Sequence, residues 1–214
     1  MASSAVNIIW DWRLSHIRRD ADYSPILRNL PGLLCVSSDM ENTQPRVGAP
    51  EWLILIGASF FILVLAVSAV WEADIRWLHF FQAWMYLATI YLALRRNRWG
   101  YFIGISAAGL WCYTNLFVTT FFKNGLERLV EWVSTGHLAR PDLLIAVPAW
   151  LSNFLIIAGC ISAYGRLKEK SLTDFGLFLI TFALTTGFFA ADMALFQPRY
   201  LPLFRGMLHP RWMF

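Results

Sequence analysis

Five long apolar runs are the feature of this sequence that most restricts its fold. They cover residues 52–70, 77–94, 99–122, 143–164 and 175–195, and each has 18 to 24 residues. A helix needs about 20 apolar residues to cross the roughly 30 Å of hydrocarbon in a bilayer. We therefore predict an all-α integral membrane protein, built as a bundle of about five transmembrane helices.

Composition and charge agree with a lipid environment. Charged residues make up 15% of the chain and hydrophobic residues 57%, whereas about a quarter of a soluble domain is charged. The net charge is +4, but the basic residues are scattered in short loops, where they set topology. The lipid bilayer is therefore the predicted partner, and binding to nucleic acid is not expected.

The apolar runs divide the chain into three parts. Residues 1–50 are predicted to be an N-terminal cytoplasmic tail, which is either an interfacial helix or disordered. A third possibility is that translation starts at Met40, which would leave a short polar leader before the first run. Residues 51–195 form the predicted five-helix transmembrane domain, and residues 196–214 form a C-terminal tail.

Two short basic turns indicate the orientation. One contains Arg95, Arg96 and Arg98, and the other contains Arg166, Lys168 and Lys170. Five spans place both turns on the same side, and basic residues in short loops favour the cytoplasm. We therefore interpret these six residues as topology anchors of a protein in the plasma (inner) membrane, with a cytoplasmic N-terminus. Basic residues in the 123–142 loop and the tail argue for the opposite orientation.

The second and third runs carry two different helical faces. His79, Gln82, Tyr86 and Thr89 follow steps of three and four residues, so they share one face. Lipid cannot satisfy these polar groups, and we expect this face to point into the bundle. In the third run, the small residues that repeat every four positions are Gly100, Gly104, Ala108 and Cys112. Small residues let membrane helices approach closely, so this face is predicted to pack against another helix.

Three local patterns refine the remaining segments. Between the third and fourth runs, apolar residues gather on one side of a short amphipathic helix, which we expect at the membrane surface. Pro148 should distort the start of the fourth run. Ser171 to Asp174 resembles a capping box before the fifth run.

Under the predicted topology, the polar groups within the runs gather toward the non-cytoplasmic side. The candidate residues for a ligand or proton pathway are His79, Gln82, Asn115 and Asp192. The sharper interpretation is a water-accessible cavity that opens outward. The alternative is that these groups are interfacial, or join helices by hydrogen bonds.

The sequence contains none of the common catalytic, phosphate-binding or metal-binding motifs. We therefore predict no catalytic residues, no metal and no cofactor, and do not expect an enzyme. The leading hypothesis is a small-solute or proton-coupled transporter. The alternatives are a non-catalytic subunit or scaffold of a larger membrane complex and, third, an intramembrane enzyme. As partners we expect further copies of the chain or other membrane subunits.

Overall fold

Helices account for all the regular secondary structure in residues 47–137 and 140–208, which are the residues that this computed structural model describes. The all-α prediction is therefore confirmed for this part of the chain. The predictions for residues 1–46, including a start at Met40, and for residues 209–214 lie outside the described residues. The helices are α2 (Ala49–Trp71), α3 (Arg76–Leu94), α4 (Arg98–Tyr113), α5 (Phe121–Thr135), α6 (Pro141–Leu144), α7 (Ala146–Gly165), α8 (Leu172–Phe196) and α9 (Pro202–Leu208), with short helical turns η1 (Ala73–Ile75), η2 (Thr114–Val118) and η3 (Pro198–Tyr200).

Four helical segments in the described residues are long and apolar enough to cross a membrane. They are Ala49–Trp71, Arg98–Val118, Pro141–Gly165 and Leu172–Phe196. The sequence predicted five, and the difference is α3, which has 19 residues but is not among the four. Its length suffices, but the polar side chains of Arg76, His79 and Gln82 lower its hydropathy.

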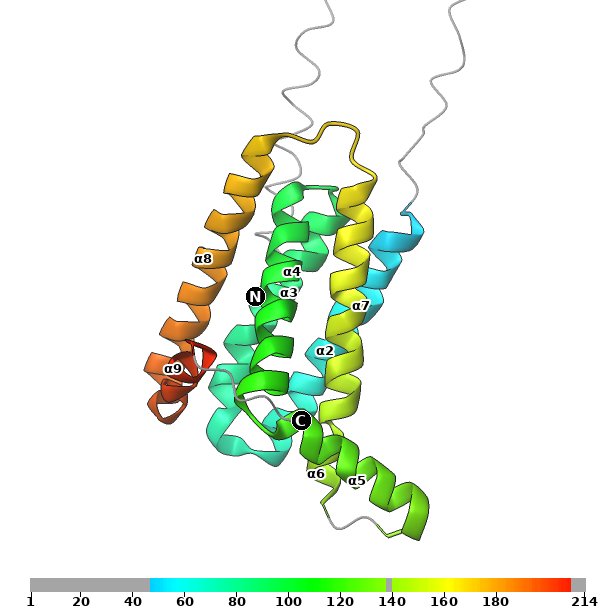
Figure 1. The fold of residues 1–214 in the computed structure, drawn as a ribbon, viewed down its shortest axis with the longest axis vertical. Coiled ribbons are helices and arrows are strands. Elements are labelled where there is room, and N and C mark those ends of the chain that lie inside the picture. Colours follow the sequence, from blue (N-terminus) through cyan, green and yellow to red (C-terminus); the bar gives the residue numbers. More distant parts are fainter. Residues whose placement is uncertain (1–46, 138–139, 209–214) are drawn as a thin grey trace, which may run out of the picture. The chain divides into compact units, whose positions relative to one another are not determined.

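The helices pack with α4 in a central position. Helix α4 contacts α3, α7 and α8, while α2 packs against α7 and α3. The α3–α4 turn and the α7–α8 connection lie at one end of the bundle (Figure 1), which we call the turn end. The opposite end, which we call the cavity end, holds η1, η2, α6 and α9.

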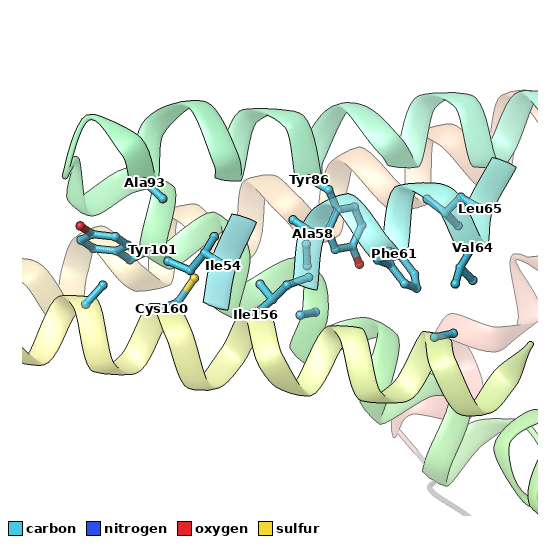
Figure 2. Close-up of a cluster of buried hydrophobic side chains, with 14 of the residues drawn as sticks. Ile54, Ala58, Phe61, Val64, Leu65, Tyr86, Ala93, Tyr101, Ile156 and Cys160 are labelled. Atoms are coloured by element: carbon cyan, nitrogen blue, oxygen red, sulfur yellow. The ribbon is translucent and has the colours of Figure 1, made fainter. Parts of the chain in front are cut away.

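Helices α2 and α7, which make the most extensive contact among the described elements, approach each other through two glycines. A methyl group added at Gly57 would lie 2.8 Å from the Ser152 carbonyl oxygen, and one at Gly159 would lie 2.9 Å from the Pro50 carbonyl oxygen. Figure 2 shows the buried side chains beside this contact, including Ile54 on α2, Ile156 on α7 and Tyr86 on α3.

The third predicted span, 99–122, is divided between two helices. Helix α4 continues into the π-helical turn η2, which ends at Val118, and α5 begins at Phe121. Thr119 is extended, and its hydroxyl accepts a hydrogen bond from the Phe121 amide at 3.3 Å. Thr119, the residue that follows η2, therefore satisfies the first amide of α5.

The fourth and fifth predicted spans also differ in detail. In place of one helix over 143–164, α6 and α7 meet at Ile145, three residues before Pro148. Pro148 has no N–H to bond the carbonyl of Leu144, which explains the break. Helix α8 starts three residues before the predicted 175, because Ser171 and Asp174 form a complete capping box.

Helix α5 is the helix found within the predicted 123–142 loop. Gly125 is buried against α6 and α7, where an added methyl group would lie 2.7 Å from the Ala146 Cβ atom. Farther along α5, the apolar residues Leu126, Val130 and Val133 are exposed. The helix ends at Gly136, whose φ of 69° is left-handed and suits glycine.

Candidate functional site

A cavity of about 360 Å³ opens at the cavity end of the bundle. Residues from α2, α3, η2, α6, α8 and α9 line it, so segments from the whole described chain contribute to its wall. Binding sites for small molecules commonly have volumes of about 300–1,000 Å³ and a largely apolar wall with a few polar groups. Both properties apply here.

Three of the four predicted pathway residues line this cavity. His79 and Gln82 reach it from α3, and Asn115 reaches it from η2. Asp192 is not part of the wall, but Phe189 and Met193, on either side of it in α8, are. The structure therefore brings three of the candidates together and places the fourth on a helix that forms one wall.

Two titratable side chains near the cavity contain buried atoms without a hydrogen-bond partner among the described residues. These atoms are Nδ1 of His79 and both carboxylate oxygens of Asp192. Asp192 is 4% exposed. A buried charge without a partner is costly, so a carboxyl group in this position is either protonated or paired with a ligand.

A hydrogen bond between α3 and α7 fixes one of the side chains that line the cavity. Tyr86 lines the cavity, and its hydroxyl donates to Oδ1 of Asn153 at 3.0 Å. The Asn153 amide in turn donates to the carbonyl oxygen of Ala149 at 2.8 Å. Both side chains are almost fully buried, so the pair is satisfied internally and orients the tyrosine ring.

The polar groups of η2 bond mainly to their own helix. The Thr114 hydroxyl donates to the Leu110 carbonyl at 2.8 Å, and the Asn115 amide donates to the Trp111 carbonyl at 2.9 Å. The Thr119 hydroxyl lies 3.4 Å from the Asn115 Oδ1 atom. These bonds hold Asn115 at the cavity wall. π-Helical turns of this kind often occur at functional sites.

Two parts of the wall were missed by the sequence analysis. Arg140 and Asp142, around the start of α6, line the cavity and form a double hydrogen bond, with Nε–Oδ1 and Nη2–Oδ2 distances of 2.9 and 2.6 Å. Helix α9 also forms part of the cavity wall. It is held in place by the Tyr113 hydroxyl, which donates a hydrogen bond to the Met207 carbonyl at 2.8 Å. The sequence predicted a tail over residues 196–214 and did not predict this location.

Beside the cavity, the chain that follows α8 contacts the loop between α2 and α3. The Gln197 amide donates to the Asp74 carbonyl, and Arg199 lies 3.4 Å from the Asp74 carboxylate. These contacts link residues more than 120 positions apart.

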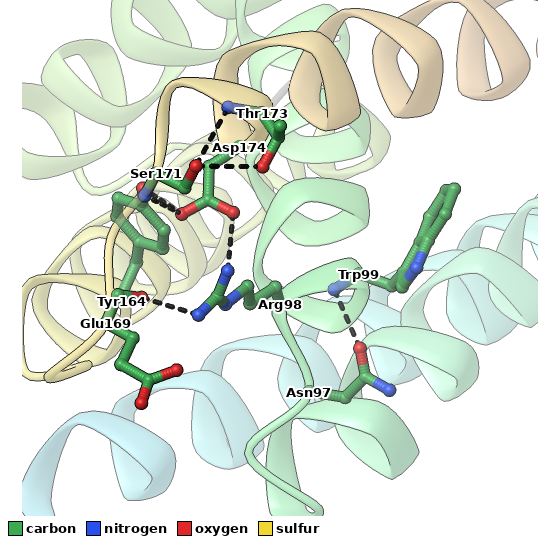
Figure 3. A network of polar contacts seen from close by, with 8 residues as sticks. All are labelled: Asn97, Arg98, Trp99, Tyr164, Glu169, Ser171, Thr173 and Asp174. Atoms are coloured by element: carbon green, nitrogen blue, oxygen red, sulfur yellow. Dashed lines mark hydrogen bonds and ion pairs between the residues drawn. The ribbon is translucent and has the colours of Figure 1, made fainter.

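The turn end contains the predicted topology anchors, and two of them also form ion pairs with acidic residues of other helices. Arg98 binds the Asp174 carboxylate at 2.7 Å and the Glu169 carbonyl at 2.5 Å, as Figure 3 shows. Arg96 lies 3.9 Å from the buried Glu51 of α2. The other four lie at the same end: Arg95 over the Tyr91 ring, Lys170 bonded to the Gly165 carbonyl, and Arg166 and Lys168 exposed.

The small face of α4 lies against α3 and α7. Gly100, Gly104 and Ala108 are buried and Cys112 is partly buried. A methyl group on Gly104 would lie 2.7 Å from the Cys160 sulfur and 2.8 Å from Thr89 Cγ2.

The described residues contain no group of three or more His, Cys, Asp or Glu side chains that could hold a metal ion. Comparisons of the chain with protein-family models, with curated proteins and with solved structures found no match.

Proposed function

We propose that this is a multi-pass membrane protein that binds a small solute in the cavity and transports it. The observation that supports this is the cavity itself, whose wall combines polar groups from α3, η2 and α6 with aromatic side chains from α4 and α8. Such a mixture suits a solute with an apolar body and a polar group. The buried groups of His79 and Asp192 are the candidates for proton coupling.

The proposal includes five membrane crossings. Helix α3 contacts α2, α4 and α8, so its polar face is covered by other helices rather than by lipid. Five crossings place the basic turn end in the cytoplasm and the cavity on the outer side of the plasma (inner) membrane. Entry of the solute from outside follows from this orientation.

The decisive experiment fills the cavity and leaves the fold intact. Ser68 lines the cavity, whereas Ser59, on the same helix, is exposed on the outer surface. The Ser68→Phe and Ser59→Phe variants therefore add the same side chain inside and outside the cavity. Purified wild type and both variants are screened by thermal shift against neutral, cationic and anionic small solutes, and stabilising solutes are then tested for uptake in proteoliposomes.

We expect at least one solute to stabilise and enter vesicles with the wild type and Ser59→Phe, but not with Ser68→Phe. If no solute stabilises the wild type, or if Ser68→Phe responds like Ser59→Phe, the cavity is not the binding site and the proposal is wrong.

A second candidate, a subunit of a larger membrane complex, is favoured by the outer face of α3. Its exposed large side chains follow a seven-residue repeat: Trp77, Phe80, Trp84, Leu87, Tyr91 and Leu94. This spacing is typical of a helix that packs along another helix. Native electrophoresis of the mildly solubilised protein tests this candidate, since Trp84→Ala should shift a complex to smaller size, whereas a protein that migrates alone would exclude it.

A further inference from the structure

The two basic turns of the bundle come together at the turn end. Arg96, in the α3–α4 turn, lies 3.9 Å from Glu51 at the start of α2. A methyl group added at Gly48 would lie 2.7 Å from Oε2 of Glu51 and 3.2 Å from Nη1 of Arg166, so the α7–α8 connection reaches the same place. Arg98 joins the two turns a second time (Figure 3), through the bonds described above. The turns therefore form one surface.

This surface carries an excess of positive charge. Its basic side chains are Arg95, Arg96, Arg98, Arg166, Lys168 and Lys170, and its acidic side chains are Glu51, Glu169 and Asp174. The described part of the turn end therefore has three more positive than negative groups.

The arrangement of the acidic groups concentrates this excess on the exposed side. Two of the three carboxylates are buried, and each lies beside an arginine of the α3–α4 turn. Arg95, Arg166 and Lys168 are exposed and form no ion pair with a described residue. The Arg95 guanidinium lies 4.3 Å over the Tyr91 ring, and this contact uses the face of the group and leaves its N–H groups available.

Exposed apolar side chains lie directly beside these basic groups. They are Tyr91, Leu94, Trp99, Leu172 and Phe175, and Leu172 is 95% exposed. Aromatic residues at the ends of membrane-spanning helices are typical of the layer in which lipid headgroups meet water. The basic groups therefore lie at the level of the headgroups, in whichever leaflet the turn end faces.

We propose that the turn end binds the headgroups of anionic phospholipids, and that Arg95, Arg166 and Lys168 pair with their phosphate groups. Guanidinium and phosphate form strong, often forked, hydrogen bonds, and basic clusters beside membrane-spanning helices attract anionic lipids. A zwitterionic lipid carries an ammonium group beside its phosphate, so the excess positive charge favours lipids with a net negative charge. This preference is independent of the solute and adds a lipid partner to the role of these residues in topology.

Lipid retention tests the inference on the full-length protein. The protein is reconstituted in vesicles of equal amounts of phosphatidylglycerol and phosphatidylcholine with identical acyl chains, extracted in mild detergent, and analysed for bound lipid by mass spectrometry. We expect phosphatidylglycerol to be enriched about tenfold or more, since each basic group at the surface contributes a preference of about fivefold. Both leaflets have the same composition, so the result does not depend on the orientation of the protein.

Matched variants then locate the preference. Lys168 and Lys123 are both exposed and form no ion pair within the described chain, but Lys123 lies on α5 at the cavity end. Lys168→Gln should lower the enrichment about two- to fivefold, and Lys123→Gln should leave it unchanged. A variant that combines Arg95→Gln, Arg166→Gln and Lys168→Gln should retain the two lipids in nearly the ratio of the vesicles.

Three results would contradict the inference. Equal retention of the two lipids by the wild type, which requires no variant, would exclude the preference, as would full enrichment by the combined variant. Equal losses in Lys123→Gln and Lys168→Gln would show that the preference does not arise at the turn end. Displacement of bound phosphatidylglycerol by soluble glycerol 3-phosphate would show that the surface binds phosphate compounds from water, and the lipid assignment would be wrong. None of these results bears on the cavity, which Ser68→Phe tests separately.

Discussion

The Nη1 atom of Arg98 lies 2.7 Å from Oδ1 of Asp174, and this pair ties the start of α4 to the start of α8. The second oxygen of Asp174 accepts hydrogen bonds from the Tyr164 hydroxyl at 3.0 Å and from the Ser171 amide at 3.1 Å. One carboxylate therefore caps α8 and connects it to two other helices. Because α8 packs mainly against α4 and α3 among the described helices, this junction is a main constraint on its position.

Removal of the carboxylate at this junction should destabilise the protein. Asp174→Ala leaves Tyr164 without its acceptor, removes the carboxylate partner of Arg98 and breaks the capping box of α8, so we expect the apparent Tm to fall by several degrees. Arg95→Ala is the control, since Arg95 lies in the same basic turn but is exposed over the Tyr91 ring. Equal Tm values for the two variants in detergent would contradict the role assigned to Asp174.

The hydrogen bond between Tyr86 and Asn153 should show strong coupling. Tyr86→Phe leaves the buried Asn153 Oδ1 atom without its donor, which we expect to lower the free energy of unfolding by about 1–3 kcal/mol. Asn153→Leu likewise leaves the tyrosine hydroxyl unpaired. The double variant removes both polar partners and should cost less than the sum of the single variants. Reversible denaturation in micelles measures all three, and simple additivity would show that the bond contributes no coupling.

Two glycines of α4 should respond in opposite ways to the same substitution. Gly104→Ala places a methyl group 2.7 Å from the Cys160 sulfur, and this overpacking should cost about 1–3 kcal/mol. A methyl group on Gly109 meets nothing within 4 Å, so Gly109→Ala should leave stability unchanged or raise it by up to about 1 kcal/mol through helix propensity. If thermal unfolding shows the same change for both variants, α4 does not make the close contact described.

Accessibility of introduced cysteines should distinguish the two ends of the bundle. Glu169 lies at the turn end and Ser134 on α5 at the cavity end, and both are exposed. In a Cys35→Ser background, an impermeant maleimide should label Ser134→Cys in intact cells, and Glu169→Cys only after permeabilisation. The reverse pattern would invert the proposed orientation, and labelling of both sites in intact cells would exclude five crossings.

Local patterns predicted much of the secondary structure. The capping box formed by Ser171 and Asp174 could be recognised from the sequence, because its two partners lie three residues apart. The break before Pro148 follows from a single missing N–H. The end of α4 was not predicted, because Asn115 and Thr119 continue the small face of α4 in steps of three and four residues. The π-helical turn is set by backbone bonding, in which the Thr119 amide donates to the Thr114 carbonyl at 2.8 Å.

The candidate site was predictable only in part. His79 and Gln82 were identifiable because lipid cannot satisfy polar groups in an apolar run. Arg140 and Asp142 lie beyond such a run, in a segment that reads as an ordinary loop, and Phe204 lies in the tail. Their convergence on one cavity depends on how α6 and α9 pack, and no periodicity in the sequence encodes those contacts.

The sequence by itself determined the all-helical class and the presence of helices long and apolar enough to cross a membrane, because hydropathy and helical periodicity depend on residues within a few turns of one another. Only the tertiary structure decided that Arg98 binds Asp174, that Arg140 is occupied by Asp142, and that α9 closes one wall of the cavity. Whether a charged side chain is free or paired depends on partners that packing supplies. For Arg98, that partner lies 76 residues away.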